Sequence, residues 1–189
     1  NSMFKTIILW WGLNIKDIVY NQICKLTDKK NIEGTRFILA ISGGLDSVAL
    51  LNLILKIKKN VAIDLSLFHV NYNMHSKSQI MSDYCSSLAQ ENNLKFYLED
   101  FDYKKFNNKN IEAKARTFRY EKLTDICSKN KINYVLTAHH QDDQIETIYM
   151  AENKNSSWVS KIGIRSKFDL YNKNNMKVCL IRPMLDIPK

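Results

Sequence analysis

The sequence predicts an α/β fold, with a doubly wound, mostly parallel sheet and helices on both faces. Short apolar runs alternate along the 189 residues with segments whose apolar residues recur at helical spacing. The run over residues 37–41 is apolar throughout, as is typical of a strand covered on both faces. Ligands of such sheets bind beyond the carboxyl ends of the strands, so the stretches that follow the strands form the candidate site.

Each element follows from the local pattern. Residues 14–29 predict a helix whose apolar side chains share one face, namely Ile15, Ile18, Val19 and Ile23. The remaining elements are expected in this order: strand 37–41, helix 48–57, strand 63–70, helix 77–92, strand 95–101, helix 111–129, strand 134–138, helix 142–151 and strand 178–181. Polar stretches rich in functional groups follow three strands, at residues 42–47, 69–75 and 137–146. We therefore expect a single site.

The length fits one core, and we expect a helical extension over residues 1–34 packed on a catalytic domain over residues 35–189. The apolar run Ile7–Trp11 is too short to span a bilayer, and no small-residue cleavage site follows it. A packing helix is expected there rather than a signal peptide, and no membrane partner is expected.

The net charge of +9 favours an anionic partner such as nucleic acid, although the 23 lysines and 5 arginines also fit AT-rich coding bias. The four cysteines form no C-x-x-C pair, which argues against a zinc, iron–sulfur or dithiol site and predicts reduced thiols. The expected compartment is a bacterial cytoplasm, or the stroma or matrix of an organelle with an AT-rich genome.

The first polar stretch reads Ser42, Gly43, Gly44, Leu45, Asp46 and Ser47. Two glycines let the backbone turn sharply after a buried strand, and the following helix N-terminus favours a phosphate. Asp46 or Ser47 is expected to cap that helix. A carboxylate beside phosphates needs a bridging cation, so Asp46 implies Mg²⁺ as its ligand. An ordinary Gly-Gly turn with a helix cap is the alternative interpretation.

The second stretch, residues 137–147, contains His139, Asp143 and Glu146. In a helix that starts near Asp142, the two carboxylates share a face, and His139 precedes it on the same side. They suit the binding of a cation or of an incoming amine, whereas the alternative is an acidic first turn that only stabilises the helix.

The third stretch, residues 110–120, has Asn110 as the expected helix cap and places Arg116 and Arg119 three residues apart. Arginines suit contacts with ATP phosphates or an RNA backbone. An ion pair between Glu112 and Arg116 is the alternative.

The loop over residues 42–47 resembles the S-G-G-x-D-S pyrophosphate loop of the N-type ATP pyrophosphatase (PP-loop) superfamily. Together with residues 110–120, 137–147 and 181–186, it resembles the tRNA(Ile)-lysidine synthetase family over residues 35–188. That family adenylates the wobble cytidine of the CAU anticodon, and free L-lysine then displaces AMP through its ε-amino group. The resemblance implies tRNA(Ile) and lysine as substrates, with ATP and Mg²⁺.

Carried over to this sequence, the resemblance makes Ser42, Gly43, Gly44, Leu45, Asp46 and Ser47 the pyrophosphate and Mg²⁺ loop. It implies that Arg116 or Arg119 contacts the nucleotide or the adenylate. It also implies that His139, Asp143 and Glu146 hold the lysine amine and the reacting cytidine.

The sequence departs from the family in three places. Tyr72, Asn73 and His75 replace a usual His, Gly and Arg, and residues 150–154 replace an Arg-Gly pair. The chain stops at Lys189 without the C-terminal region that many members use to hold tRNA. A reduced enzyme, a fragment and a homodimer are all compatible with this length.

A tRNA 2-thiolation enzyme of the same fold is the nearest alternative, but that group typically needs cysteine pairs. Enzymes like GMP synthetase or NAD synthetase share the loop but are not expected to share residues 110–120. A catalytically impaired RNA-binding module is the third alternative, and the presence of Asp46, His139, Asp143 and Glu146 argues against it.

Overall fold

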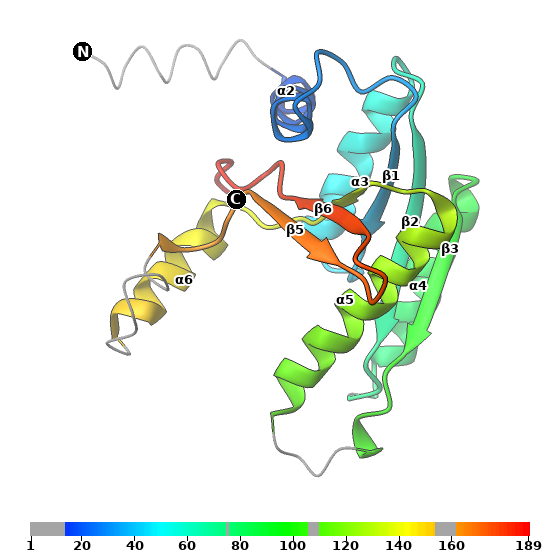
Figure 1. Ribbon diagram of the computed structural model, residues 1–189, viewed down its shortest axis with the longest axis vertical. Helices are drawn as coiled ribbons and strands as arrows, with labels where there is room; N and C mark the ends of the chain where they lie inside the picture. Colours follow the sequence, from blue (N-terminus) through cyan, green and yellow to red (C-terminus); the bar gives the residue numbers. More distant parts are fainter. Residues whose placement is uncertain (1–13, 75, 106–109, 154–161) are drawn as a thin grey trace.

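The computed structural model describes residues 14–74, 76–105, 110–153 and 162–189 (Figure 1). Its helices are α2 (Ile15–Thr27), α3 (Leu45–Lys58), α4 (Ser78–Glu91), α5 (Ile111–Asn130) and α6 (Gln141–Asn153), with a 3-10 turn η1 (Tyr103–Lys105). Its strands are β1 (Arg36–Ala40), β2 (Asp64–Asn71), β3 (Lys95–Asp100), β4 (Tyr134–Leu136), β5 (Lys167–Tyr171) and β6 (Lys177–Ile181). The expected packing helix at Ile7–Trp11 lies outside the described residues.

The six strands form one sheet in the order β3-β2-β1-β4-β6-β5. All neighbouring strands are parallel except β5, which runs antiparallel to β6. Phe37 of β1 lies opposite Leu65 of β2 on one side and Tyr134 of β4 on the other. The chain thus leaves β1 toward β2 and returns to β4, and this reversal opens a crevice beyond the ends of β1 and β4.

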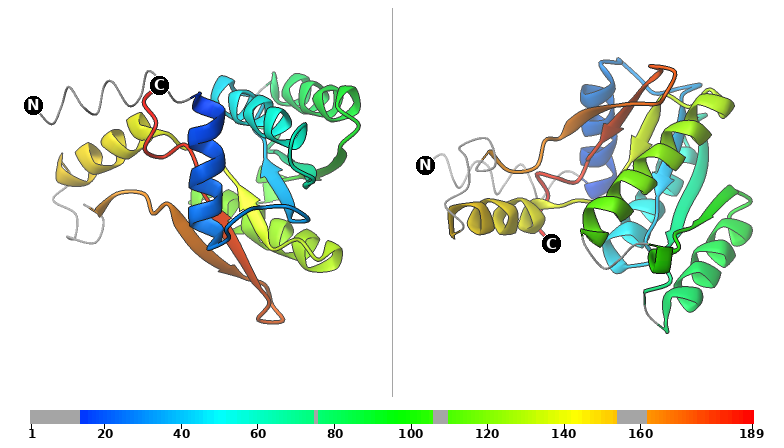
Figure 2. Two further views of the ribbon diagram at one scale, coloured as in Figure 1. Left: turned by 90° about the horizontal axis from the view of Figure 1, so that it is seen from above. Right: turned by 60° about the horizontal axis from the view of Figure 1, so that its bottom comes forward.

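Helices cover both faces of the sheet, which confirms the predicted fold class (Figures 1 and 2). One core joins α2, α3 and α4 to the face that carries Phe37, Leu39 and Leu67. The other joins α5 to the opposite face, which carries Ile38 and Phe68. Successive strand residues enter different cores because side chains alternate across a strand. α6 covers neither face and extends away from the sheet (Figure 1).

The edge strand β5 was not predicted. Its sequence alternates polar and apolar residues, and among its five residues only Leu170 is buried. This alternation is the pattern of a half-exposed strand, so a signal was present in the sequence and was missed.

Two predicted helix caps are wrong. α3 begins at Leu45, so Gly44 is the N-cap residue and has no side chain to cap with. Asp46 and Ser47 therefore lie inside the first turn. Asn110 precedes α5 with φ +58°, and its side chain makes no capping hydrogen bond. A capping side chain needs extended backbone to reach the amides of the first turn, and the left-handed conformation prevents this.

Within the described residues, no helix is long and apolar enough to cross a membrane. All four cysteines are free. Burial raises the pKa of the Cys85 thiol to about 11 and that of Cys127 to about 12, so both stay protonated at neutral pH.

Candidate active site

The loop between β1 and α3 turns at Gly43. Gly43 has φ +83°, and a Cβ atom built on it would lie 2.8 Å from Cε of Met81. Gly44 has φ −73° in extended backbone, and its nearest neighbour would be the Ser42 hydroxyl at 3.4 Å. Of the paired glycines, Gly43 is therefore the one whose backbone conformation requires glycine.

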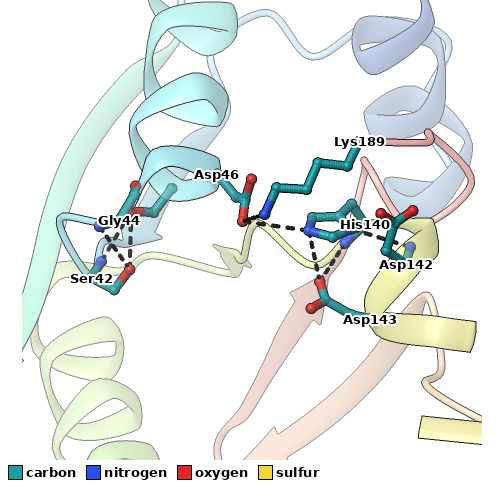
Figure 3. A network of polar contacts seen from close by, with 8 residues as sticks. Ser42, Gly44, Asp46, His140, Asp142, Asp143 and Lys189 are labelled. Carbon is teal, nitrogen blue, oxygen red and sulfur yellow. Dashed lines mark hydrogen bonds and ion pairs between the residues drawn. The ribbon is translucent and has the colours of Figure 1, made fainter. Parts of the chain in front are cut away.

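Two serines hold the loop in shape (Figure 3). The buried Ser47 hydroxyl donates to the Gly44 carbonyl at 2.8 Å and accepts from the Ser42 amide at 3.3 Å. The Ser42 hydroxyl lies 3.1 Å from the Ser47 hydroxyl and accepts from the Gly44 amide at 3.3 Å. Leu45 begins α3 with its side chain exposed. These bonds fix the shape of the loop at the N-terminus of α3, where the first amides of a helix have no intrahelical partner.

Asp46 projects from the first turn of α3 toward α6. Its Oδ2 lies 3.4 Å from Nε2 of His140 and 3.2 Å from Nζ of Lys189 (Figure 3). The carboxylate is 37% exposed, so it remains open to a ligand. This carboxylate is half-exposed and lies beside a loop suited to phosphate. Its oxygens are the kind of ligand that Mg²⁺ prefers.

His140 caps α6, a role that the sequence analysis missed. Its carbonyl accepts from the Gln144 amide, and its Nδ1 accepts from the Asp142 amide at 3.2 Å. Asp143 closes the cap by accepting from the His140 amide at 2.8 Å. Because Nδ1 accepts, the ring proton lies on Nε2, which faces Asp46 and also lies 3.6 Å from Asp143 Oδ2. The position of His140 directly before an acidic first turn was the available signal.

His139 is held as a neutral hydrogen-bond donor. Its Nδ1 accepts from Nε of Arg182 at 3.3 Å and lies 3.1 Å from the Thr137 hydroxyl. Burial, and then the charge of Arg182, lowers the pKa of His139 from 6.5 to about 4. The remaining nitrogen, Nε2, therefore carries the proton at neutral pH and cannot accept one.

The two arginines of α5 stack on one tyrosine. The Arg116 and Arg119 guanidinium carbons lie 4.9 and 5.2 Å from the centre of the Tyr120 ring. Such contacts restrict a long side chain to one direction. Arg116 forms this contact rather than the alternative ion pair with Glu112.

Three cavities adjoin these residues at the carboxyl edge of the sheet. The apolar pocket, of about 300 Å³, is lined mainly by β1, β2 and α4, including Phe68, Val70, Tyr72, Met74, Met81 and Arg119. The loop pocket, of about 240 Å³, includes Ser42, Asp46, Ser47, Arg119, His139 and Asp143. The charged pocket, of about 520 Å³, includes Arg116, His139, Asp143, Glu146, Arg165 and Arg182.

The structure thus places the stretches over residues 42–47, 110–120 and 137–147 around neighbouring cavities. Arg119 lines the apolar and loop pockets, whereas Arg116 and Glu146 line only the charged pocket among these three. His139 and Asp143 line both the loop pocket and the charged pocket. The functional groups of the loop pocket and those of the charged pocket therefore meet at His139 and Asp143.

The altered stretch after β2 keeps a compact shape. Asn73 has φ +53°, a conformation that asparagine tolerates better than most residues and that suits the usual glycine. Its amide donates to the Asn71 side chain at 3.0 Å, and Tyr72 packs edge-on against Phe101. His75 lies outside the described residues.

The segment that closes the charged pocket was not predicted either. Gly163, Ile164, Arg165 and Phe168 line this cavity. The Ile164 amide donates to the side chain of Gln144, which ties the segment to α6. No motif marked it, because its contribution depends on a contact between distant parts of the chain.

The fold, with a glycine loop between β1 and α3, is typical of an α/β nucleotide-binding domain. The chain belongs to the PP-loop domain family, whose family model matches residues 16–189. It is 33% identical over 152 residues to a tRNA(Ile)-lysidine synthase of Enterococcus faecalis, which covers 80% of this chain and 32% of that protein. It is 35% identical over 155 residues to one of Rickettsia bellii, with 82% and 34% covered. The chain therefore spans about a third of the length of these relatives.

Two solved structures share the fold. A U34-tRNA thiolase, NcsA of Methanococcus maripaludis with its 4Fe–4S cluster, has a TM-score of 0.69 at 19% identity and covers 93% of this chain and 59% of its own. An NH3-dependent NAD synthetase of Campylobacter jejuni has a TM-score of 0.56 at 14% identity, with 94% and 69% covered. Among the residues that the structure describes, which include all four cysteines, no three His, Cys, Asp or Glu side chains are grouped to hold a metal.

Proposed function

We propose that this chain performs the lysidine synthetase reaction on tRNA(Ile) with the CAU anticodon. The wobble cytidine O2 attacks the α-phosphorus of ATP, the bond to the β-phosphate oxygen breaks, and pyrophosphate leaves. The ε-amino group of free L-lysine then attacks C2, and AMP departs with the oxygen while the amine loses protons. The similarity to lysidine synthases over four-fifths of the chain supports this choice of substrate.

One observation carries the proposal. His139 and Asp143 line both the loop pocket and the charged pocket. A nucleotide bound through the loop and an acceptor bound in the charged pocket therefore meet at these two side chains. This is the geometry that AMP transfer requires, because the reacting groups must be held in contact.

We assign the nucleotide to the loop and apolar pockets. The apolar lining suits an adenine base, and the α3 N-terminus with Ser42, Gly43, Gly44 and Ser47 suits the phosphates. Arg119 lines both cavities, so it is the arginine placed for the phosphate chain. Asp46 would hold Mg²⁺, which when bound neutralises charge on the departing pyrophosphate.

We assign the charged pocket to the acceptors. Asp143 and Glu146 lie on one face of α6 and line it together, so they would bind the lysine ammonium and accept its proton. His139 cannot accept a proton, because its Nδ1 is occupied by Arg182. It would donate through Nε2 to an oxygen of the cytidine or of the transferred phosphoryl group.

The bacterial origin of the relatives supports a bacterial cytoplasm as the site of the reaction. The homodimer stays a prediction.

The proposal is tested by incubating the 189-residue protein with ATP, Mg²⁺, labelled lysine and tRNA(Ile) bearing CAU. Label in the tRNA, with release of AMP and pyrophosphate, is the expected result. A transcript with a UAU anticodon is the matched control and should stay unlabelled. No label, together with no ATP–pyrophosphate exchange, would overturn the proposal. Label from a sulfur donor would favour the thiolation alternative.

The variant Asp46→Asn tests the assigned role of the loop carboxylate. It keeps the size of the side chain but removes the charge that Mg²⁺ needs, so we expect exchange to fall by more than roughly 100-fold. Binding of tRNA should be largely unchanged. Asp64→Asn is the control, because Asp64 is exposed at the start of β2, far from the loop, and pairs only loosely with Arg36 at 3.9 Å.

A further inference from the structure

Arg182 is the one buried arginine among the five, all of which lie in the described part of the chain. It follows β6, and its backbone amide is fixed by the Ser166 carbonyl at 2.9 Å. Its guanidinium donates to Nδ1 of the neutral His139 and to the carbonyl of Arg165. Both acceptors are uncharged.

A buried cation without a carboxylate is unfavourable, because the protein replaces its water with weaker partners. Burial lowers the pKa of the Arg182 guanidinium; Tyr120 opposes this shift, while Arg116 and Arg119 add to it. Arg116 and Arg165 also line the charged pocket but are exposed, so water solvates them. Among the arginines that line this cavity, Arg182 is thus the one that a bound anion would stabilise most.

The cavity has a carboxylate wall and a guanidinium wall. Asp143 and Glu146 come from α6, while Arg182 comes from the end of β6 and Arg116 from α5. A ligand with a carboxylate at one end and an ammonium at the other matches both walls. Arg182 lines neither the loop pocket nor the apolar pocket, which argues against a phosphate of the nucleotide as its partner.

We propose that Arg182 binds the α-carboxylate of the free amino acid and thereby selects it over amines that lack this group. The inference rests on the proposed function for the identity of the nucleophile. With the carboxylate held by Arg182, the side-chain amine extends toward Asp143 and the nucleotide. Arg182 is then a residue that determines specificity, in addition to the groups that handle the amine.

The test compares lysine with 1,5-diaminopentane, which has the same amine but no carboxylate. With wild type we expect kcat/KM to be roughly 30- to 100-fold higher for lysine. With Arg182→Gln, which keeps a hydrogen-bonding side chain, the value for lysine should fall to that for the diamine. The value for the diamine should change less than about threefold. An equal fall for both amines would show a merely structural role and overturn the inference, as would a wild type that does not prefer lysine.

Arg165→Gln is the matched control, since it removes one positive charge from an exposed position of the same cavity. It should change the preference for lysine less than about threefold, and an effect as large as that of Arg182→Gln would contradict the inference. Titration calorimetry with both amines, in the presence of ATP, gives a readout that needs no turnover. If no lysidine forms, the proposed function fails, yet lysine that binds more tightly than the diamine only when Arg182 is present would still support the inference. Equal binding of both amines would overturn it.

Discussion

Nε2 of His140 lies 3.4 Å from Oδ2 of Asp46, and this contact joins the β1–α3 loop region to the start of α6. The two residues are far apart in the sequence but follow neighbouring strands, β1 and β4. His140 is fixed by its role as the cap of α6, so its Nε2–H has a defined direction. The cap of one helix thereby orients the carboxylate of another (Figure 3).

This arrangement predicts different effects for two substitutions of His140. His140→Ala removes the cap acceptor and should lower the free energy of unfolding by about 1 kcal/mol. His140→Asn restores an acceptor at the same position, so its stability should lie within about 0.5 kcal/mol of wild type. Both variants lose the contact with Asp46, and ATP–pyrophosphate exchange should fall by about tenfold. Urea unfolding and the exchange assay separate the two roles; normal exchange in His140→Asn would contradict the second.

The paired glycines predict a second contrast. Gly43→Ala places a Cβ atom 2.8 Å from Met81 Cε and imposes φ +83° on a residue that disfavours it. We expect a loss of about 1–2 kcal/mol in the free energy of unfolding. Gly44→Ala adds a Cβ atom in ordinary contact distance at φ −73°, so its stability should change by less than about 0.5 kcal/mol. Equal destabilisation by both variants, measured in urea, would show that the loop is held differently.

Much of the architecture could be predicted because burial leaves a periodic record in the sequence. The strand over residues 37–41 and the helix over residues 111–129 match β1 and α5 to within one residue at each end. The edge strand β5 has only a five-residue alternation with Leu170 buried, and this short pattern was missed. Stretches rich in functional groups supplied the candidate side chains, and the family resemblance implied their roles. The parallel topology explains why these stretches converge.

The finer geometry of the site could not be predicted. Which of two adjacent histidines caps α6 depends on the exact start of the helix, and sequence patterns define this poorly. That Arg119 faces the loop pocket and Arg116 the charged pocket depends on their stacking against Tyr120. These are tertiary contacts, for which a single sequence has no periodic signal.

Lys189 predicts how the loop carboxylate responds to Mg²⁺. Its ammonium lies 3.2 Å from Asp46 Oδ2 and is 54% exposed, so it would compete with a cation for this carboxylate. Such a pair is worth no more than about 1 kcal/mol, so Lys189→Met should lower the Mg²⁺ concentration for half-maximal exchange by about two- to fivefold. Added salt should reduce the difference. Lys177→Met is the control, because Lys177 pairs with Asp169 in the β5–β6 hairpin, and an increased Mg²⁺ requirement for Lys189→Met would contradict the prediction.

His139 predicts the pH dependence of stability. Burial, and then the charge of Arg182, lowers its pKa from 6.5 to about 4. Between these values the unfolded chain binds a proton that the native state does not, so stability rises with pH in this window. The contribution is complete above pH 6.5 and is lost as the pH falls toward 4. Relative to His139→Gln, wild type should lose on the order of 2 kcal/mol between pH 7 and pH 4.5.

Urea unfolding of both proteins at several pH values measures this difference, and NMR titration of the His139 ring gives its pKa directly. The pH profile of kcat should show no inflection from His139 above pH 6, because the ring is already neutral there. A measured pKa near 6.5 would mean that Arg182 does not hold Nδ1 as its acceptor. His139 could then exchange a proton with the amine, and the assignment of proton removal to Asp143 and Glu146 alone would be wrong.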